Sequence, residues 1–157
     1  MAVEYELAIA ADAASVSAEL LLPGVRPERA LAAFTDPDLV RKWWTAELTA
    51  QLVPGGEYLA RFPALGQTMI GVVEEYVPGR LLAFTWGWSH QLEAAGRYGV
   101  IVSAASTALI EGRGARFDLV HAPRAGVHVP ADDPAPGEHR AGWEHFLPRL
   151  AASLTTY

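Results

Sequence analysis

The chain has 157 residues, 51% hydrophobic and 19% charged, with no cysteine and a formal net charge of −6 at pH 7. The missing cysteines exclude disulfides, thiolate nucleophiles and cysteine-based metal centres. The acidic balance, without any run of Lys or Arg, argues against nucleic acid and anionic membranes as partners. No apolar run approaches the roughly 18 residues that span a bilayer. The N-terminus also lacks the features of a secretory signal, so we expect a cytoplasmic protein.

The N-terminal quarter predicts two strands followed by two short helices. Residues 3–9 alternate apolar and polar side chains, as expected of a half-buried strand, and 16–22 follow as a second strand. The first helix should begin near Pro27, where a missing backbone N–H costs little. The second has Asp36 as its cap and Pro37 at its first position, and it should end at a pair of tryptophans.

A meander of antiparallel strands is expected next. Pro–Gly and Gly-rich breaks interrupt the apolar segments at intervals that suit hairpin turns. These turns are Pro54-Gly55-Gly56, Pro78-Gly79 and Gly112-Arg113-Gly114. The strands that they separate are 46–53, 57–63, 68–77, 81–88, 99–111 and 115–121.

The C-terminal part predicts a long loop and one amphipathic helix. Residues 122–137 hold four prolines and two glycines, so they should form a proline-rich loop, and a loop of this length often has a function. Residues 138–155 should form the helix, which Pro148 is expected to bend. Its apolar stripe has helical spacing and consists of Trp143, Leu147, Leu150 and Leu154, with Phe146 beside it.

Five sequence strings carry a family resemblance. In order, they are PERALAAFTDPDLVRKWW, LVPGGEYLARF, EYVPGRLLAFTW, GARFDLVH and HRAGWEHFLPRLAASL, within roughly residues 15–155. Together they resemble the SRPBCC group of START-related helix-grip domains, most of all its bacterial branch similar to the activator of heat-shock protein 90 ATPase. The resemblance implies an α+β fold, in which a curved antiparallel sheet grips the long C-terminal helix around a cavity. Residues 1–14 add an extra strand to this pattern, within a single domain spanning 1–157.

The resemblance and the strand alternation together indicate an aromatic interior. One reading is a filled core, because aromatic side chains bury large areas in any small domain. The other is a cavity that binds a ligand. The residues expected to line it are Trp43, Trp44, Tyr58, Phe62, Met69, Phe84, Trp86, Trp88, Phe117, Leu119, His121, Trp143 and Leu147.

Two polar residues are weak candidates for catalysis. His121 shares a strand face with Phe117 and Leu119, where it could orient a ligand, act as a general base, or merely bind a loop carbonyl. Glu74 and Glu75 are adjacent on a strand and should point to opposite faces. The family strings place Glu75 at a recurring acid, and an inward carboxylate would have a raised pKa. The alternative is a structural ion pair with Arg61, Arg80 or Arg97.

The sequence does not support a metal or another cofactor. His139 and His145 are six residues apart and cannot meet on one helix face, and no zinc spacing is present. His121 and His128 could meet across the loop, but two histidines alone make a weak site. No nucleotide-binding or serine-hydrolase motif occurs. Asp132 and Asp133 are interpreted as solvated loop charges.

Three functions remain open. The first is binding of a small apolar or aromatic molecule in the cavity. The second is an enzyme similar to the polyketide cyclases, acting on a bound carbonyl compound. The third is a protein-interaction module that regulates a chaperone. Homodimerisation is also plausible, because the strand 3–9 offers an edge that can pair.

Overall fold

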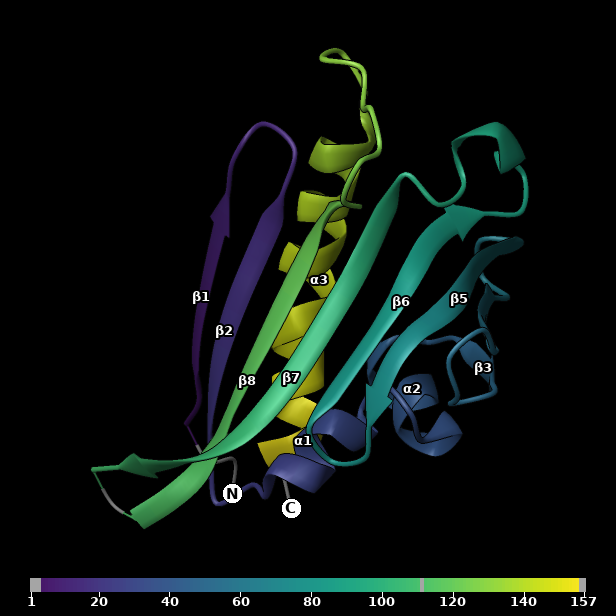
Figure 1. Ribbon diagram of the computed structural model, residues 1–157. Coiled ribbons are helices and arrows are strands. Elements are labelled where there is room, and N and C mark those ends of the chain that lie inside the picture. The colour runs from purple at the N-terminus through teal and green to yellow at the C-terminus, as the bar shows by residue number, and fades with distance from the viewer. Residues whose placement is uncertain (1–3, 111, 156–157) are drawn as a thin grey trace.

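The computed structural model describes residues 4–110 and 112–155, which form one eight-stranded antiparallel sheet, three α-helices and one 3-10 helix (Figure 1). The strands lie in the order β1-β2-β8-β7-β6-β5-β4-β3. Their bounds are β1 Glu6–Ala11, β2 Val16–Pro23, β3 Glu47–Ala50, β4 Glu57–Phe62, β5 Gln67–Val77, β6 Leu81–Trp88, β7 Tyr98–Leu109 and β8 Gly112–Pro123. The helices are α1 Pro27–Ala32, α2 Pro37–Trp43, the 3-10 helix η1 Leu92–Ala94, and α3 Ala135–Thr155.

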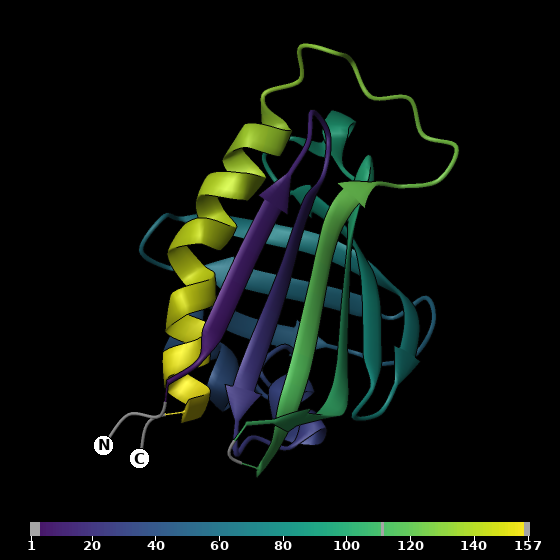
Figure 2. The ribbon, with the colours of Figure 1, turned by 90° about the vertical axis from the view of Figure 1, so that its left-hand side faces the viewer.

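The curved sheet wraps around the long helix α3. Figure 2 shows α3 lying along one face of the sheet, with β1, β2 and β8 running beside it and the far strands crossing behind it. The predicted α+β helix-grip fold is therefore confirmed. Within the described residues, no helix is both long and apolar enough to cross a membrane.

The helix cap and the turn glycines predicted in the first half of the chain have the expected conformations. Asp36 caps α2, since its Oδ1 accepts a hydrogen bond from the Asp38 backbone N–H at 2.9 Å. Gly55 and Gly79 take positive φ angles of 85° and 72° in their turns, which explains glycine at both positions. The first strand begins later than predicted, at Glu6, and Val3 lies outside the described residues.

The strand β5 contains a bulge that overturns one prediction. Val73 pairs with Phe84, but Glu75 pairs with Ala83, so Glu74 is an extra residue in the ladder. A bulge interrupts the strict alternation of faces. Glu74 and Glu75 are consequently both exposed, and the expectation that one of them must point inward is wrong.

The connection between β8 and α3 is shorter than the predicted loop. Pairing of β8 with β7 continues to Pro123, opposite Tyr98, and α3 already begins at Ala135. The early helix start has a local cause, because the Asp133 Oδ1 accepts a hydrogen bond from the Ala135 backbone N–H at 3.0 Å. The loop proper therefore spans 124–134, and it arches over the first turn of α3 (Figure 2).

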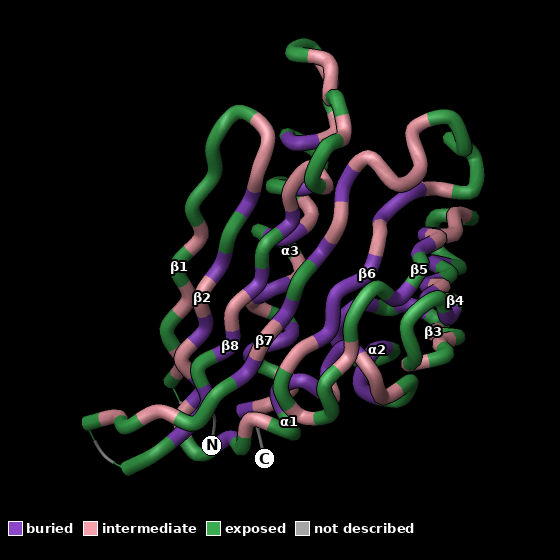
Figure 3. Tube along the Cα trace, in the orientation of Figure 1, coloured by how far each residue is buried: buried purple, intermediate pink, exposed green. Residues whose placement is uncertain are grey.

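The core lies between the sheet and the helices. Figure 3 shows buried residues recurring along the central strands, while β1 carries only exposed and intermediate residues. Two large aromatic side chains are tied to the backbone after α1: Trp43 Nε1 donates to the Ala33 carbonyl at 2.7 Å, and the Tyr58 hydroxyl donates to the Phe34 carbonyl at 2.6 Å. The two rings are therefore buried while their polar atoms remain hydrogen-bonded, as is usual for buried polar groups.

Candidate functional site

Most of the predicted cavity residues are buried packing residues of the core. They are nearly or fully buried and border neither of the two hollows described below. Tyr58 stacks on Phe84 with ring centroids 4.1 Å apart. The predicted cavity residues found in this group are Trp43, Tyr58, Met69, Phe84, Phe117, Leu119, His121 and Leu147.

The other five predicted residues border a real hollow. It has a volume of about 200 Å³ and lies between the strands β4, β5 and β6 and the first half of α3. An engineered apolar cavity of about 150 Å³ accepts benzene, so this space suits one aromatic ring with a substituent. The predicted residues that border it are Trp44, Phe62, Trp86, Trp88 and Trp143; the remaining border consists of Leu65, Gln67, Glu138, His139, Gly142 and Phe146.

A second, more polar hollow of about 190 Å³ shares part of this wall. The four residues common to both spaces are Trp86, Trp88, Glu138 and His139. On its other side it is bounded by η1, by the start of β7 and by the start of α3. The shared residues therefore form a partition with an aromatic hollow on one side and a polar one on the other.

Two buried histidines stack on each other at this partition: His139 belongs to it, and His121 lies behind it. His121 on β8 and His139 on α3 have ring centroids 3.7 Å apart and an interplanar angle of 19°. Trp143 Nε1 donates a hydrogen bond to His121 Nδ1 at 2.9 Å. Because Nδ1 accepts, a neutral His121 must carry its proton on Nε2. The prediction that His121 faces inward is confirmed, but the ring is sealed in the core.

Both histidines are held neutral by their surroundings. Burial lowers the pKa of His121 well below 6.5, and the neighbouring His139 adds to this effect. Burial also lowers the pKa of His139 to about 4, although the negative charge of Asp133 acts in the opposite direction. Near neutral pH the pair consists of two uncharged rings.

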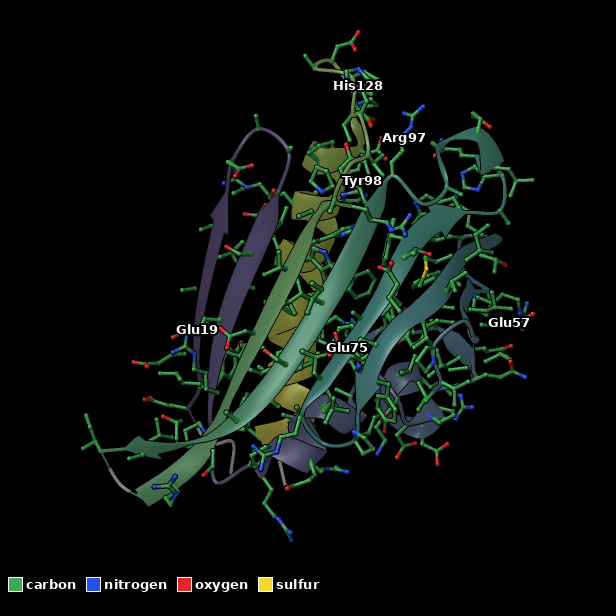
Figure 4. All side chains as sticks on the ribbon, in the orientation of Figure 1. Glu19, Glu57, Glu75, Arg97, Tyr98 and His128 are labelled. Atoms are coloured by element: carbon green, nitrogen blue, oxygen red, sulfur yellow. The ribbon has the colours of Figure 1, made fainter. Side chains whose placement is uncertain are left out.

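Asp133 fastens the start of α3 to the sheet. Besides capping the helix, its Oδ2 accepts a hydrogen bond from the Tyr98 hydroxyl at 3.0 Å and lies 3.6 Å from Arg97 Nη1. Burial, followed by the hydrogen bond to Asp133, raises the pKa of Tyr98 to about 12. Figure 4 shows Arg97 and Tyr98 at the upper end of the sheet, beneath the loop. The interpretation of Asp133 as a solvated loop charge is wrong.

Three polar atoms in this cluster are buried without a protein partner. They are Trp86 Nε1, His121 Nε2 and His139 Nδ1. The three rings lie together, with centroids 4.7 Å apart for Trp86 and His121 and 5.8 Å apart for Trp86 and His139. Buried polar groups are nearly always paired in proteins, so three such atoms in one cluster mark the most unusual place in this molecule.

The positions of the remaining candidate residues do not support catalysis or metal binding. Glu75 is exposed in the middle of the sheet, far from the upper end where His128 extends on the loop (Figure 4). Glu74, rather than Glu75, forms an ion pair, and its partner Arg124 is not among the arginines predicted. In the part of the chain that the structure describes, no group of three His, Asp or Glu side chains could hold a metal ion.

His139 is the main site residue that sequence reasoning missed. Its signal was present, because His139 precedes Trp143 by four residues and Leu147 by eight, on the same stripe of the helix. The predicted stripe, however, counted only apolar residues, so it began at Trp143 although the predicted helix 138–155 already contained His139. His145 is exposed, as its position on the opposite side of the helix requires.

Comparison with known proteins places the chain in a family. The family model described as "Activator of Hsp90 ATPase homolog 1-like protein" matches residues 25–155. The chain therefore belongs to this family, as its sequence strings suggested. None of the curated proteins matches it in sequence.

Solved structures show the same fold at low sequence identity. The Aha1 dimer from Colwellia psychrerythraea aligns with a TM-score of 0.70 and 18% identity, over 90% of this chain and 96% of that one. Protein MLL2253 from Mesorhizobium loti aligns with a TM-score of 0.68 and 21% identity, over 89% and 96% of the two chains. DynU16, from the dynemicin biosynthetic locus, aligns with a TM-score of 0.65 and 22% identity, over 90% of this chain but 47% of its own.

Proposed function

We propose that this protein binds a small apolar or aromatic molecule in the aromatic hollow between the sheet and α3. The observation that carries the proposal is the hollow itself, about 200 Å³ in volume and bordered by four tryptophans and two phenylalanines. Small-molecule sites combine such apolar walls with a few polar groups, and His139 and Glu138 supply these here. The occurrence of a similar fold in a biosynthetic locus agrees with a small organic ligand.

Blocking the hollow from α3 tests the proposal. Gly142 borders the hollow, and a Cβ added there would meet nothing within 4 Å. The variant Gly142→Leu should fill this space, while its better helix propensity offsets part of any strain. Gly137→Leu is the matched control, because Gly137 lies on the same helix, is exposed and has equally open surroundings, but does not border the hollow.

The readout is the melting temperature with ethylbenzene or naphthalene as the probe. A probe at about 100 times its Kd stabilises the native state by about 2.7 kcal/mol, which is a shift of several degrees. We expect this shift in the wild type and in Gly137→Leu, and its loss in Gly142→Leu. Equal shifts in all three proteins, or none in the wild type, would contradict the proposal.

We also propose that the chain forms a homodimer through β1. Among the described strands β1 pairs only with β2, and an unpaired strand edge is a ready template for a second chain. A similar structure is that of a dimer, which agrees with this idea. Light scattering over a range of concentrations should give the mass of two chains, whereas a constant monomer mass would refute it.

A further inference from the structure

The unpartnered donors beside the hollow indicate what the ligand carries. Tryptophan Nε1–H can donate but never accept a hydrogen bond, so Trp86 requires an acceptor. The Trp143 contact makes His121 Nε2 a second donor in the same ring cluster. Because His121 borders neither hollow, a ligand in this space can reach only the Trp86 donor of these two.

The charges around the two hollows distinguish between kinds of acceptor. Glu138 borders both spaces, and Glu93 and Asp133 border the second. In the described part of the chain, no Arg or Lys borders either one. Asp133 is already paired with Arg97, but among the described residues the aromatic hollow has only the Glu138 carboxylate and no cation in its wall. An anionic ligand there would meet a like charge, and transferring it from water would cost far more than transferring a neutral oxygen. The stacked histidines add no positive charge, because their lowered pKa values keep them neutral.

We infer that the ligand is a neutral aromatic ketone or quinone, whose carbonyl oxygen accepts a hydrogen bond from Trp86 Nε1–H. This inference rests on the proposed function and names the chemical class that the same hollow selects. Trp86 is only 8% exposed and its Nε1 has almost no accessible surface, so the proposed contact requires the wall to shift when the ligand binds. The half-buried Trp88 and the exposed Glu138 are the wall residues able to move, and such side-chain adjustments are common on binding.

Three single-ring probes of similar size separate the possibilities. Acetophenone carries a neutral carbonyl, ethylbenzene replaces it by a methylene group, and benzoate carries a negative charge. We expect acetophenone to bind about tenfold more tightly than ethylbenzene, because a buried donor gains its missing partner. Benzoate should bind at least about tenfold more weakly than acetophenone, for the electrostatic reason above.

The indole N–H resonances of the 15N-labelled protein give a readout specific to the contact. The Trp86 signal is assigned by its absence in Trp86→Phe. Acetophenone should move this signal downfield, as a new hydrogen bond requires, and ethylbenzene should not. In Trp86→Phe the preference for acetophenone over ethylbenzene should disappear. The control His145→Phe changes an exposed ring on the same helix that borders neither hollow, so it should retain the preference.

The outcomes distinguish the inference from the proposed function. If ethylbenzene binds as tightly as acetophenone, or the Trp86 signal does not move, the ketone inference is overturned while binding in the hollow stands. If benzoate binds as tightly as acetophenone, the preference for a neutral ligand is overturned. If no probe binds, both proposals fail. The wild-type comparison suffices even if Trp86→Phe does not fold.

Discussion

The buried histidine His139 makes the stability of this protein depend on pH. Its native pKa is about 4, against 6.5 for the unperturbed side chain. As the pH falls below about 6.5, the unfolded chain takes up a proton at this position while the folded protein does not. The stabilising contribution is therefore complete above about pH 6.5 and is lost progressively as the pH falls toward 4. Between about pH 7.5 and pH 5, linkage from His139 alone lowers the free energy of unfolding by about 2 kcal/mol.

Neighbouring groups modify this value without changing its sign. His121 stacks on His139 from β8, and its lowered pKa adds to the loss of stability in the same direction. Asp133 from the loop favours the charged form of His139 and opposes the shift, an effect already contained in the value of about 4. Tyr98 packs edge-on against His139 from β7, with centroids 4.8 Å apart, and stays neutral throughout this range.

Urea denaturation at about pH 7.5 and pH 5 measures the effect in the wild type and in His139→Phe. Phenylalanine keeps a ring in the stack but cannot titrate, so the loss of stability between the two pH values should shrink by about 2 kcal/mol. His145→Phe is the matched control, because His145 is exposed on the same helix. If His139→Phe and the wild type lose the same stability between the two pH values, the reasoning about this buried pair is refuted.

Three further substitutions test the packing around the site, each by urea denaturation near neutral pH. Trp143→Phe removes the donor to His121 and part of a buried ring, and should cost about 2–4 kcal/mol; a cost below about 1 kcal/mol would contradict the role of this bond. Tyr58→Phe removes only a hydroxyl that donates to a buried carbonyl at 2.6 Å, so about 1–2 kcal/mol is expected, and no loss would show that the bond contributes nothing. Gly71→Ala places a Cβ against the backbone carbonyl of Thr85, so a loss of about 1–3 kcal/mol is expected. An unchanged free energy of unfolding would contradict the close approach of β5 and β6 at this position.

The strand alternation predicted from the sequence holds wherever the ladder is regular. Phe117, Leu119 and His121 are buried together on β8, as the period of two requires. The same rule failed at Glu75, because a bulge inserts one residue into β5 and returns both glutamates to the exposed face. Nothing in the local sequence distinguishes a bulged strand from a regular one, since the extra residue is defined by its pairing with β6.

The candidate site was predictable only in part, for a similar reason. Most of the aromatic residues that border the hollow were predicted to line a cavity, but Phe146 was expected only beside the helix stripe. The roles of Asp133 and His139 depend on contacts with β7 and β8, which are distant in the sequence. An aspartate in a proline-rich loop is indistinguishable from a solvated one until its partner Tyr98 is known. Sequence patterns thus predict which residues are buried, but not which of the buried residues border an unfilled space.

Both ends of the interior are rich in aromatic residues, but they differ in how completely their buried polar atoms are hydrogen-bonded. Near α1 and α2, the polar atoms of Trp43 and Tyr58 reach backbone carbonyls at 2.7 and 2.6 Å, and both rings are fully buried. At the start of α3, equally aromatic packing leaves three buried polar atoms unpaired beside two hollows. Unpaired buried groups lower stability, and such local violations are expected where function requires them. The incomplete hydrogen bonding of Trp86, His121 and His139 is thus the stronger reason to place the proposed binding site at this end of the molecule.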